Sequence, residues 1–173
     1  RALATRMYDL AINAGIAGGL KDNAAIAVGQ VFHITSACFP EVGAENGLKS
    51  HLSLNDMQLP GADEFPFVNG VMHNKNVPVC IRSLHLPDMA GYSVNLVTGS
   101  LETQIRREHR SDTAAIETME GGGFFYACLK ENVPFAELRA VSNFIGLRDR
   151  TSWKIPEAVA ALNKTLIQLF DNL

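Results

Sequence analysis

The sequence has no long apolar run and no surplus of basic residues. Its apolar stretches stay well short of the roughly 20 residues that a membrane-spanning helix needs, so no membrane partner is predicted. Lysine and arginine together number 15 against 18 acidic residues, which gives a net charge of −3. Because there is no basic stripe, binding to nucleic acid through phosphate contacts is not predicted either.

Cysteine is sparse, and neither cysteine nor histidine is spaced like a metal site. The three cysteines, Cys38, Cys80 and Cys128, follow no ligand pattern, and we expect reduced thiols in a cytoplasmic protein. The five histidines show no His-Glu-x-x-His spacing, so neither a metal nor another cofactor is predicted. A secretory leader and the Gly-x-Ser-x-Gly motif of serine hydrolases are not found in the sequence.

The pattern that is present predicts one α/β domain over residues 1–173. Of the residues, 47% are hydrophobic, which is ordinary for a globular chain. Short apolar runs predict strands at 8–14, within 25–37, and at 65–72, 77–83, 92–98, 114–119 and 135–142. Helical spacing predicts helices at 102–110, 121–131 and from Pro156 to Leu173. Strands that alternate with helices are typical of a layered α/β domain with a parallel or mixed sheet.

Three glycines follow the first predicted strand. We expect Gly15, Gly18 and Gly19 to form a turn in which the backbone can approach a ligand closely. The spacing matches neither the dinucleotide fingerprint nor a phosphate-binding loop. A tight structural turn is therefore the simpler interpretation.

Two polar side chains stand at the ends of predicted strands. Glu120 ends one strand and Asn143 ends the next, and open α/β sheets bind ligands at the carboxyl ends of their strands. A carboxylate can hold two vicinal hydroxyls, and an amide can recognise a heterocycle, so the pair suggests a nucleoside site. Glu120 could instead be an acid favoured by the helix dipole. The glycines at 121–123 weaken a helix start by roughly 1 kcal/mol each relative to alanine, which is more easily tolerated beside a ligand.

Four motifs in order resemble the nucleoside phosphorylase/nucleosidase superfamily. They are residues 12–20 (INAGIAGGL), 97–100 (VTGS), 118–122 (TMEGG) and 139–143 (RAVSN). Within the superfamily, the segment 148–156 (RDRTSWKIP) is most similar to futalosine hydrolases. The resemblance implies a three-layer fold with a central mixed sheet flanked by helices. It also implies hydrolysis of the N-glycosidic bond of futalosine, with release of hypoxanthine in menaquinone biosynthesis.

The resemblance also assigns roles to particular residues. Glu120 would hold the ribose 2′- and 3′-hydroxyls, with Met119 packed under the sugar. Asn143 would bind the departing base, positioned by Ser142. The other residues implied in substrate binding are Ala17 and Gly18 along the base, Thr118, and Phe144 as a stacking surface.

Differences from relatives favour hydrolysis and a 6-oxopurine. Phosphorolytic relatives bind phosphate with an arginine and a serine, where this sequence has Asn13 and Ile16. Adenine-cleaving relatives have an aspartate at the position of Asn143, and an amide suits the N7 and O6 acceptors of hypoxanthine instead. An amide is also a weaker leaving-group acid than a carboxyl group.

The resemblance leaves further expectations open. The family's water-activating glutamate would lie before residue 1, and without the strands there we expect a sheet with an exposed edge. Relatives form homo-oligomers, which we also expect here. Because futalosine carries a benzoate, Arg148, Arg150 or His51 could meet its carboxylate. Alternative functions are a nucleosidase or phosphorylase for inosine or 5′-methylthioadenosine, and a non-catalytic nucleoside-binding protein.

Overall fold

The computed structural model describes residues 2–47, 51–53, 56–57, 63–108 and 115–173, and it is a mixed α/β fold as predicted. The strands are β1 (Ala11–Gly19), β2 (Val31–Cys38), β3 (Gly43–Glu45), β4 (His51–Ser53), β5 (Phe67–Val68), β6 (Val71–His73), β7 (Asp88–Ser93), β8 (Ile116–Thr118) and β9 (Phe135–Phe144). The helices are α1 (Ala2–Thr5), α2 (Val79–Arg82), α3 (Leu101–Glu108), α4 (Gly121–Lys130), the 3₁₀ turn η1 (Arg150–Ser152) and α5 (Ile155–Phe170).

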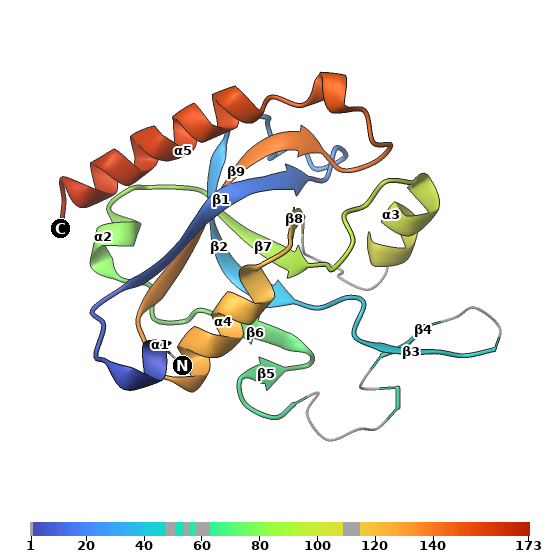
Figure 1. The fold of residues 1–173 in the computed structure, drawn as a ribbon, viewed down its shortest axis with the longest axis horizontal. Helices are drawn as coiled ribbons and strands as arrows, with labels where there is room; N and C mark the ends of the chain where they lie inside the picture. Colours follow the sequence, from blue (N-terminus) through green and yellow to red (C-terminus); the bar gives the residue numbers. More distant parts are fainter. Residues whose placement is uncertain (1, 48–50, 54–55, 58–62, 109–114) are drawn as a thin grey trace.

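Five strands of the main sheet pair in a closed ring (Figure 1). β1 is parallel to β9, and β9 is antiparallel to β2; β2, β7 and β8 are parallel, and β8 returns to β1 in the antiparallel sense. β6 and then β5 extend the sheet from β2. The ring is incomplete at one place, because residues 11–17 of β1 pair along one side alone in the described part of the chain.

Helices cover both sides of this sheet (Figure 1). Leu162 and Leu169 of α5 are buried against Leu138 of β9 on one side. On the other side, Phe125 of α4 packs edge-on against Phe135 of β9, with 4.8 Å between ring centroids. β9 is therefore covered on both faces, which explains its almost uninterrupted apolar pattern.

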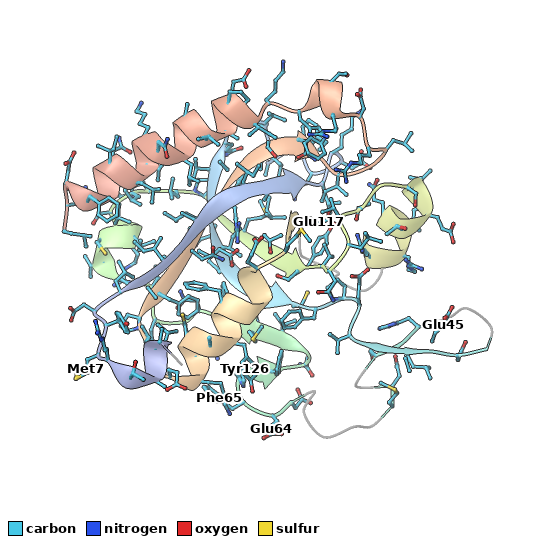
Figure 2. The ribbon with its side chains drawn as sticks, viewed as in Figure 1. Met7, Glu45, Glu64, Phe65, Glu117 and Tyr126 are labelled. Carbon is cyan, nitrogen blue, oxygen red and sulfur yellow. The ribbon has the colours of Figure 1, made fainter. Side chains whose placement is uncertain are left out.

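The surface carries several apolar side chains, whereas some of the acids are buried (Figure 2). Phe65 and Tyr126 are exposed near the outer end of α4, and the Tyr126 ring lies 6.1 Å from that of Phe67. Glu117 of β8, in contrast, is 5% exposed. In the described part of the chain, no helix is both long and apolar enough to cross a bilayer.

Most predicted elements are confirmed, with shifts of a few residues at their ends. This holds for the strands at 114–119 and 135–142 and for the helices at 102–110, 121–131 and 156–173. The predicted ends at 109–110 and 114 lie outside the described residues. The region 25–37 supplies one strand, β2, and the region 65–72 supplies two short ones, β5 and β6.

Three predictions are wrong. The glycines at 15, 18 and 19 lie within β1 and form no turn, because the parallel ladder with β9 continues to Gly19. The segment 77–83 forms helix α2, which starts after Pro78, and its backbone bonds run locally to Pro78 and Val79 rather than to a strand. The segment 92–98 leaves the sheet after Ser93, since the Thr98 amide donates to the Glu117 side chain.

We predict that the packing of α5 is a main source of stability. Replacing Leu162 with Ala leaves a cavity under α5 and should lower the free energy of unfolding by about 2–5 kcal/mol, measured by urea denaturation. The matched control is Ile167→Ala on the same helix, at a side chain that is 61% exposed, where a change within about 0.5 kcal/mol is expected. Equal effects of the two substitutions would contradict the packing described above.

Candidate active site

A cavity of about 230 Å³ opens where the carboxyl ends of β1 and β9 meet the start of α4. β1 and β9 are parallel, so their ends reach the same edge of the sheet, which is where such sheets bind ligands. Four segments of the chain line the cavity: residues 16–18, 97–98, 117–120 and 142–148, together with Trp153.

The structure brings all of the predicted substrate-binding residues to this one cavity. Those that line it are Ala17, Gly18, Thr118, Met119, Glu120, Ser142, Asn143 and Phe144. They come from three segments that are far apart in the sequence, so their convergence is a property of the fold. Their roles toward a substrate stay predictions.

Glu120 occupies the position just before α4 without capping it. Its side chain makes no hydrogen bond to the helix start, although helix N-termini favour acids. The carboxylate is 66% exposed and lies 3.2 Å from an Nη of Arg139. A capping role therefore does not account for this acid, and its carboxylate is free to take a second partner.

The glycines after Glu120 have packing explanations. A Cβ at Gly121 would lie 2.6 Å from both carboxylate oxygens of Glu137, and a Cβ at Gly122 would overlap the ring of Phe39. Gly123 has open space around it. Close contact with protein groups, rather than close approach of a ligand, thus accounts for the first two glycines.

Asn143 is held in place by its neighbours. The Ser142 hydroxyl lies 2.8 Å from Asn143 Oδ1 and 3.2 Å from the Ala17 carbonyl, so its single proton can serve either acceptor. Asn143 Nδ2 donates to the Phe144 carbonyl at 3.1 Å. An amide nitrogen has two protons, so one remains available to an acceptor in the cavity.

No family model matches the sequence, but individual relatives do. A futalosine hydrolase from Streptomyces coelicolor is 32% identical over 171 residues, which are 97% of this chain and 68% of that protein. The chain belongs to the futalosine hydrolase family. A futalosine hydrolase from Acidothermus cellulolyticus is 33% identical over 171 residues, covering 96% of this chain and 66% of the relative. The chain thus spans about two thirds of the length of these curated relatives.

Solved structures show the same fold. Futalosine hydrolase of Helicobacter pylori matches with a TM-score of 0.75 at 17% identity, over 95% of this chain and 69% of that one. A 5′-methylthioadenosine/S-adenosylhomocysteine nucleosidase from Colwellia psychrerythraea, solved with adenine, also matches with a TM-score of 0.75, at 16% identity over 95% of this chain and 67% of that one. The fold of this futalosine hydrolase family member is therefore the one found in nucleosidases.

Behind Glu120, one guanidinium serves two acids. Arg139 Nε donates to Glu137 at 2.7 Å, while an Nη of the same side chain reaches Glu120. The guanidinium crosses β1 at Gly15, where any Cβ would overlap it. Asn13 Nδ2 lies 3.4 Å from the same oxygen of Glu137. Gly15 is therefore needed because the Arg139 side chain passes close to the backbone of β1. It lies within the strand and not in the predicted turn.

Glu137 is a buried acid that was not predicted from the sequence. It is fully buried, and its Oε2 has no hydrogen-bond partner in the described part of the chain. Burial raises the pKa of its carboxyl group; the guanidinium of Arg139 opposes this, and the nearby charge of Glu120 adds to it. The signal in the sequence is a Glu-Leu-Arg stretch inside an otherwise apolar strand.

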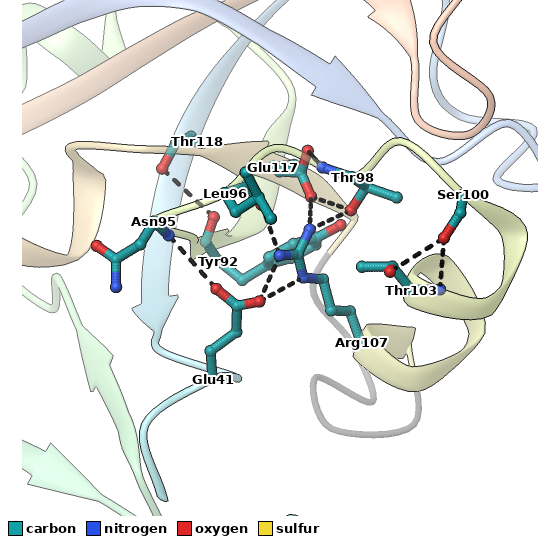
Figure 3. A network of polar contacts seen from close by, with 10 residues as sticks. All are labelled: Glu41, Tyr92, Asn95, Leu96, Thr98, Ser100, Thr103, Arg107, Glu117 and Thr118. Atoms are coloured by element: carbon teal, nitrogen blue, oxygen red, sulfur yellow. Dashed lines mark hydrogen bonds and ion pairs between the residues drawn. The ribbon is translucent and has the colours of Figure 1, made fainter.

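A second buried guanidinium holds one wall of the cavity (Figure 3). Arg107 of α3 is 1% exposed, and it contacts Glu41, Glu117 at 3.2 Å and the Leu96 carbonyl. Glu117 in turn accepts hydrogen bonds from the Thr98 amide, at 3.0 Å, and from the Thr98 hydroxyl. Because Glu117 and Thr98 both line the cavity, this network fixes the shape of that wall. The sequence did not predict this network.

We predict that Arg107→Met is strongly destabilising. Removing the guanidinium leaves Glu117 buried without its counter-charge, which should cost about 3–5 kcal/mol of unfolding free energy in urea titrations. Arg106→Met is the matched control, since Arg106 is the preceding residue of α3 and is exposed. A loss no larger than that of the control would rule out the structural role of the network.

We also predict a pH-dependent effect of Glu137→Gln. The folded-state pKa of Glu137 is raised, so its contribution to stability is complete below the unfolded value of about 4.3 and is lost as pH rises through the folded value. Glutamine does not titrate. Urea denaturation from about pH 4 to about pH 8 should therefore show the variant gaining stability relative to wild type as pH rises. A difference independent of pH would refute the raised pKa; Glu157→Gln on the exposed face of α5 is the control.

Proposed function

We propose that the chain is an N-glycosidic hydrolase that cleaves futalosine and releases hypoxanthine. The observation that carries this proposal is the meeting of Glu120 and Asn143 in one cavity of a futalosine hydrolase family member. A carboxylate and an amide in one cavity suit a sugar and a purine. Futalosine is the proposed substrate because the relatives are futalosine hydrolases.

In this proposal Glu120 binds the sugar. Its exposed carboxylate accepts hydrogen bonds from the ribose 2′- and 3′-hydroxyls, and Arg139 fixes its position through the 3.2 Å ion pair. The half-exposed Met119 side chain offers an apolar surface to the sugar ring. Glycoside cleavage passes through a cationic, oxocarbenium-like state, and a fixed negative charge near the anomeric carbon stabilises that state.

Asn143 binds the leaving base. Ser142 holds the amide in place, so the free proton on Nδ2 can point to the N7 or O6 acceptor of a 6-oxopurine. Adenine offers an amino group where hypoxanthine has O6, and one amide proton cannot serve a second donor. A hydrogen bond from Nδ2 to O6 therefore favours hypoxanthine, whereas one to N7 is open to both purines.

Water is the proposed nucleophile. Phosphorolysis needs cationic or hydroxyl groups that bind phosphate. In this chain the positions of those groups are occupied by Asn13 and Ile16. Asn13 is directed to Glu137, and Ile16 is an apolar residue of the cavity lining. Neither of them supports phosphate binding.

Wider aspects of the proposal come from the resemblance. They are a place in menaquinone biosynthesis by the futalosine route, a cytoplasmic location and a homo-oligomeric state. A small purine nucleoside is the proposed ligand, with neither nucleic acid nor membrane as a partner.

The decisive test is product chromatography after incubating the protein, in the longest form that can be purified, with futalosine, inosine and 5′-methylthioadenosine. Each is tested with and without phosphate. We expect hypoxanthine from futalosine alone, independent of phosphate. Glu120→Ala should lower kcat/KM by at least about 100-fold, as lost preorganised charges do, and leave the unfolding midpoint nearly unchanged. Glu131→Ala, at the exposed end of the same helix, is the control.

Each other outcome identifies a different error. Release of adenine, or dependence on phosphate, would overturn the proposed substrate or nucleophile. Equal losses of activity and stability in Glu120→Ala would assign this acid a structural role. Thermal stabilisation by a nucleoside without any product would favour a non-catalytic binding protein.

A further inference from the structure

The loop after β9 is fixed at both ends. The Ile145 amide donates to the Gly19 carbonyl at 2.8 Å, and the Lys154 amide donates to the Ser142 carbonyl at 2.8 Å. Between them, the Asp149 carboxylate accepts from the Thr151 amide at 2.9 Å and caps η1. The loop therefore presents its side chains to the cavity from a fixed backbone.

Arg148 and Trp153 come together on this loop. The guanidinium carbon of Arg148 lies 5.5 Å from the centre of the Trp153 ring, and both side chains line the cavity. Stacking on an aromatic ring restrains a flexible arginine. The guanidinium edge stays free to bind a carboxylate through two parallel hydrogen bonds.

Among the described residues Arg148 makes no ion pair, and it is the one cation among those that line the cavity. The neighbouring Asp149 is engaged by Thr151, and these hydrogen bonds lower the pKa of its carboxyl group. The acids in the lining, Glu117 and Glu120, already pair with other arginines.

Apolar surface surrounds this free cation. Leu147 is 80% exposed and Phe144 is 39% exposed, and both line the cavity beside Trp153. An anion alone would gain nothing from such side chains. A ring that carries a carboxylate would bury its apolar face against them and place its charge on Arg148.

We propose that Arg148 and Trp153 form a subsite for an aromatic carboxylate, separate from the groups that hold the sugar and the base. The inference rests on the proposed function, since the benzoate of futalosine has this chemistry. Of the three cations considered from the sequence, Arg148 lines the cavity, whereas Arg150 and His51 are not among the lining residues.

The test compares futalosine with its methyl ester, which keeps the ring and removes the charge. A hydrogen bond to a charged group contributes about 1.5–3 kcal/mol, so Arg148→Met should raise KM for futalosine about 10- to 100-fold and change kcat little. The ester should bind wild type and variant alike. Arg148→Lys should restore part of the affinity, because it keeps the charge without the planar fork. Arg150→Met, two residues away on the same loop, is the matched control and should behave as wild type.

The failure of this inference is distinguishable from that of the proposed function. If hypoxanthine is released but Arg148→Met affects futalosine and ester equally, the subsite is wrong and the function stands. An equal effect of Arg150→Met would also overturn the subsite. If neither compound is cleaved, calorimetric affinities for the same compounds and variants decide: a charge-dependent loss confined to Arg148 supports the subsite, and equal affinities overturn it.

Discussion

The parallel pairing of β1 with β9 is the constraint on which the site depends. β9 also pairs with β2, and helices cover both of its faces, so its position is fixed from every side. Ser142 and Asn143 stand at its carboxyl end, opposite the residues that end β1. Any slip of this ladder by one residue would turn Asn143 away from the cavity, because side chains alternate along a strand.

The same strand carries a charge pair where an apolar core is expected. Glu137 and Arg139 alternate with Ala136, Leu138 and Ala140, which face α5. Burying such a pair usually adds little stability compared with apolar residues. Its effect here is geometric, since Arg139 carries its guanidinium over β1 and holds Glu120 at the cavity. The buried charges therefore make sense as a support for the site rather than for the fold.

The sequence predicted those parts of the site that follow from local rules. Glu120 and Asn143 do line one cavity, as predicted, because polar residues at the carboxyl ends of strands reach the same edge of a sheet. The glycines of β1 resemble a turn in the local pattern, which does not reveal that side chains from outside β1 pack against them: Arg139 at Gly15, Ile145 at Gly18 and Ile26 at Gly19. The network of Arg107 was missed for the same reason: its partner Glu41 is 66 residues away in the sequence. The four residues of α2 are too few to show a helical period, so their apolar pattern predicts a strand instead.

Three arginines near the cavity differ in whether acids of the protein neutralise their positive charge. Arg107 contacts Glu41 and Glu117, and Arg139 contacts Glu137 and Glu120, so each is matched within the protein. A matched, buried guanidinium can shape a wall but has little charge left for a ligand. Among the described residues Arg148 has no such match, and it lies over the ring of Trp153 at the cavity. On the proposed function, selectivity for a charged substrate comes from this third arginine, while the other two hold in place the cavity walls that carry Glu117 and Glu120.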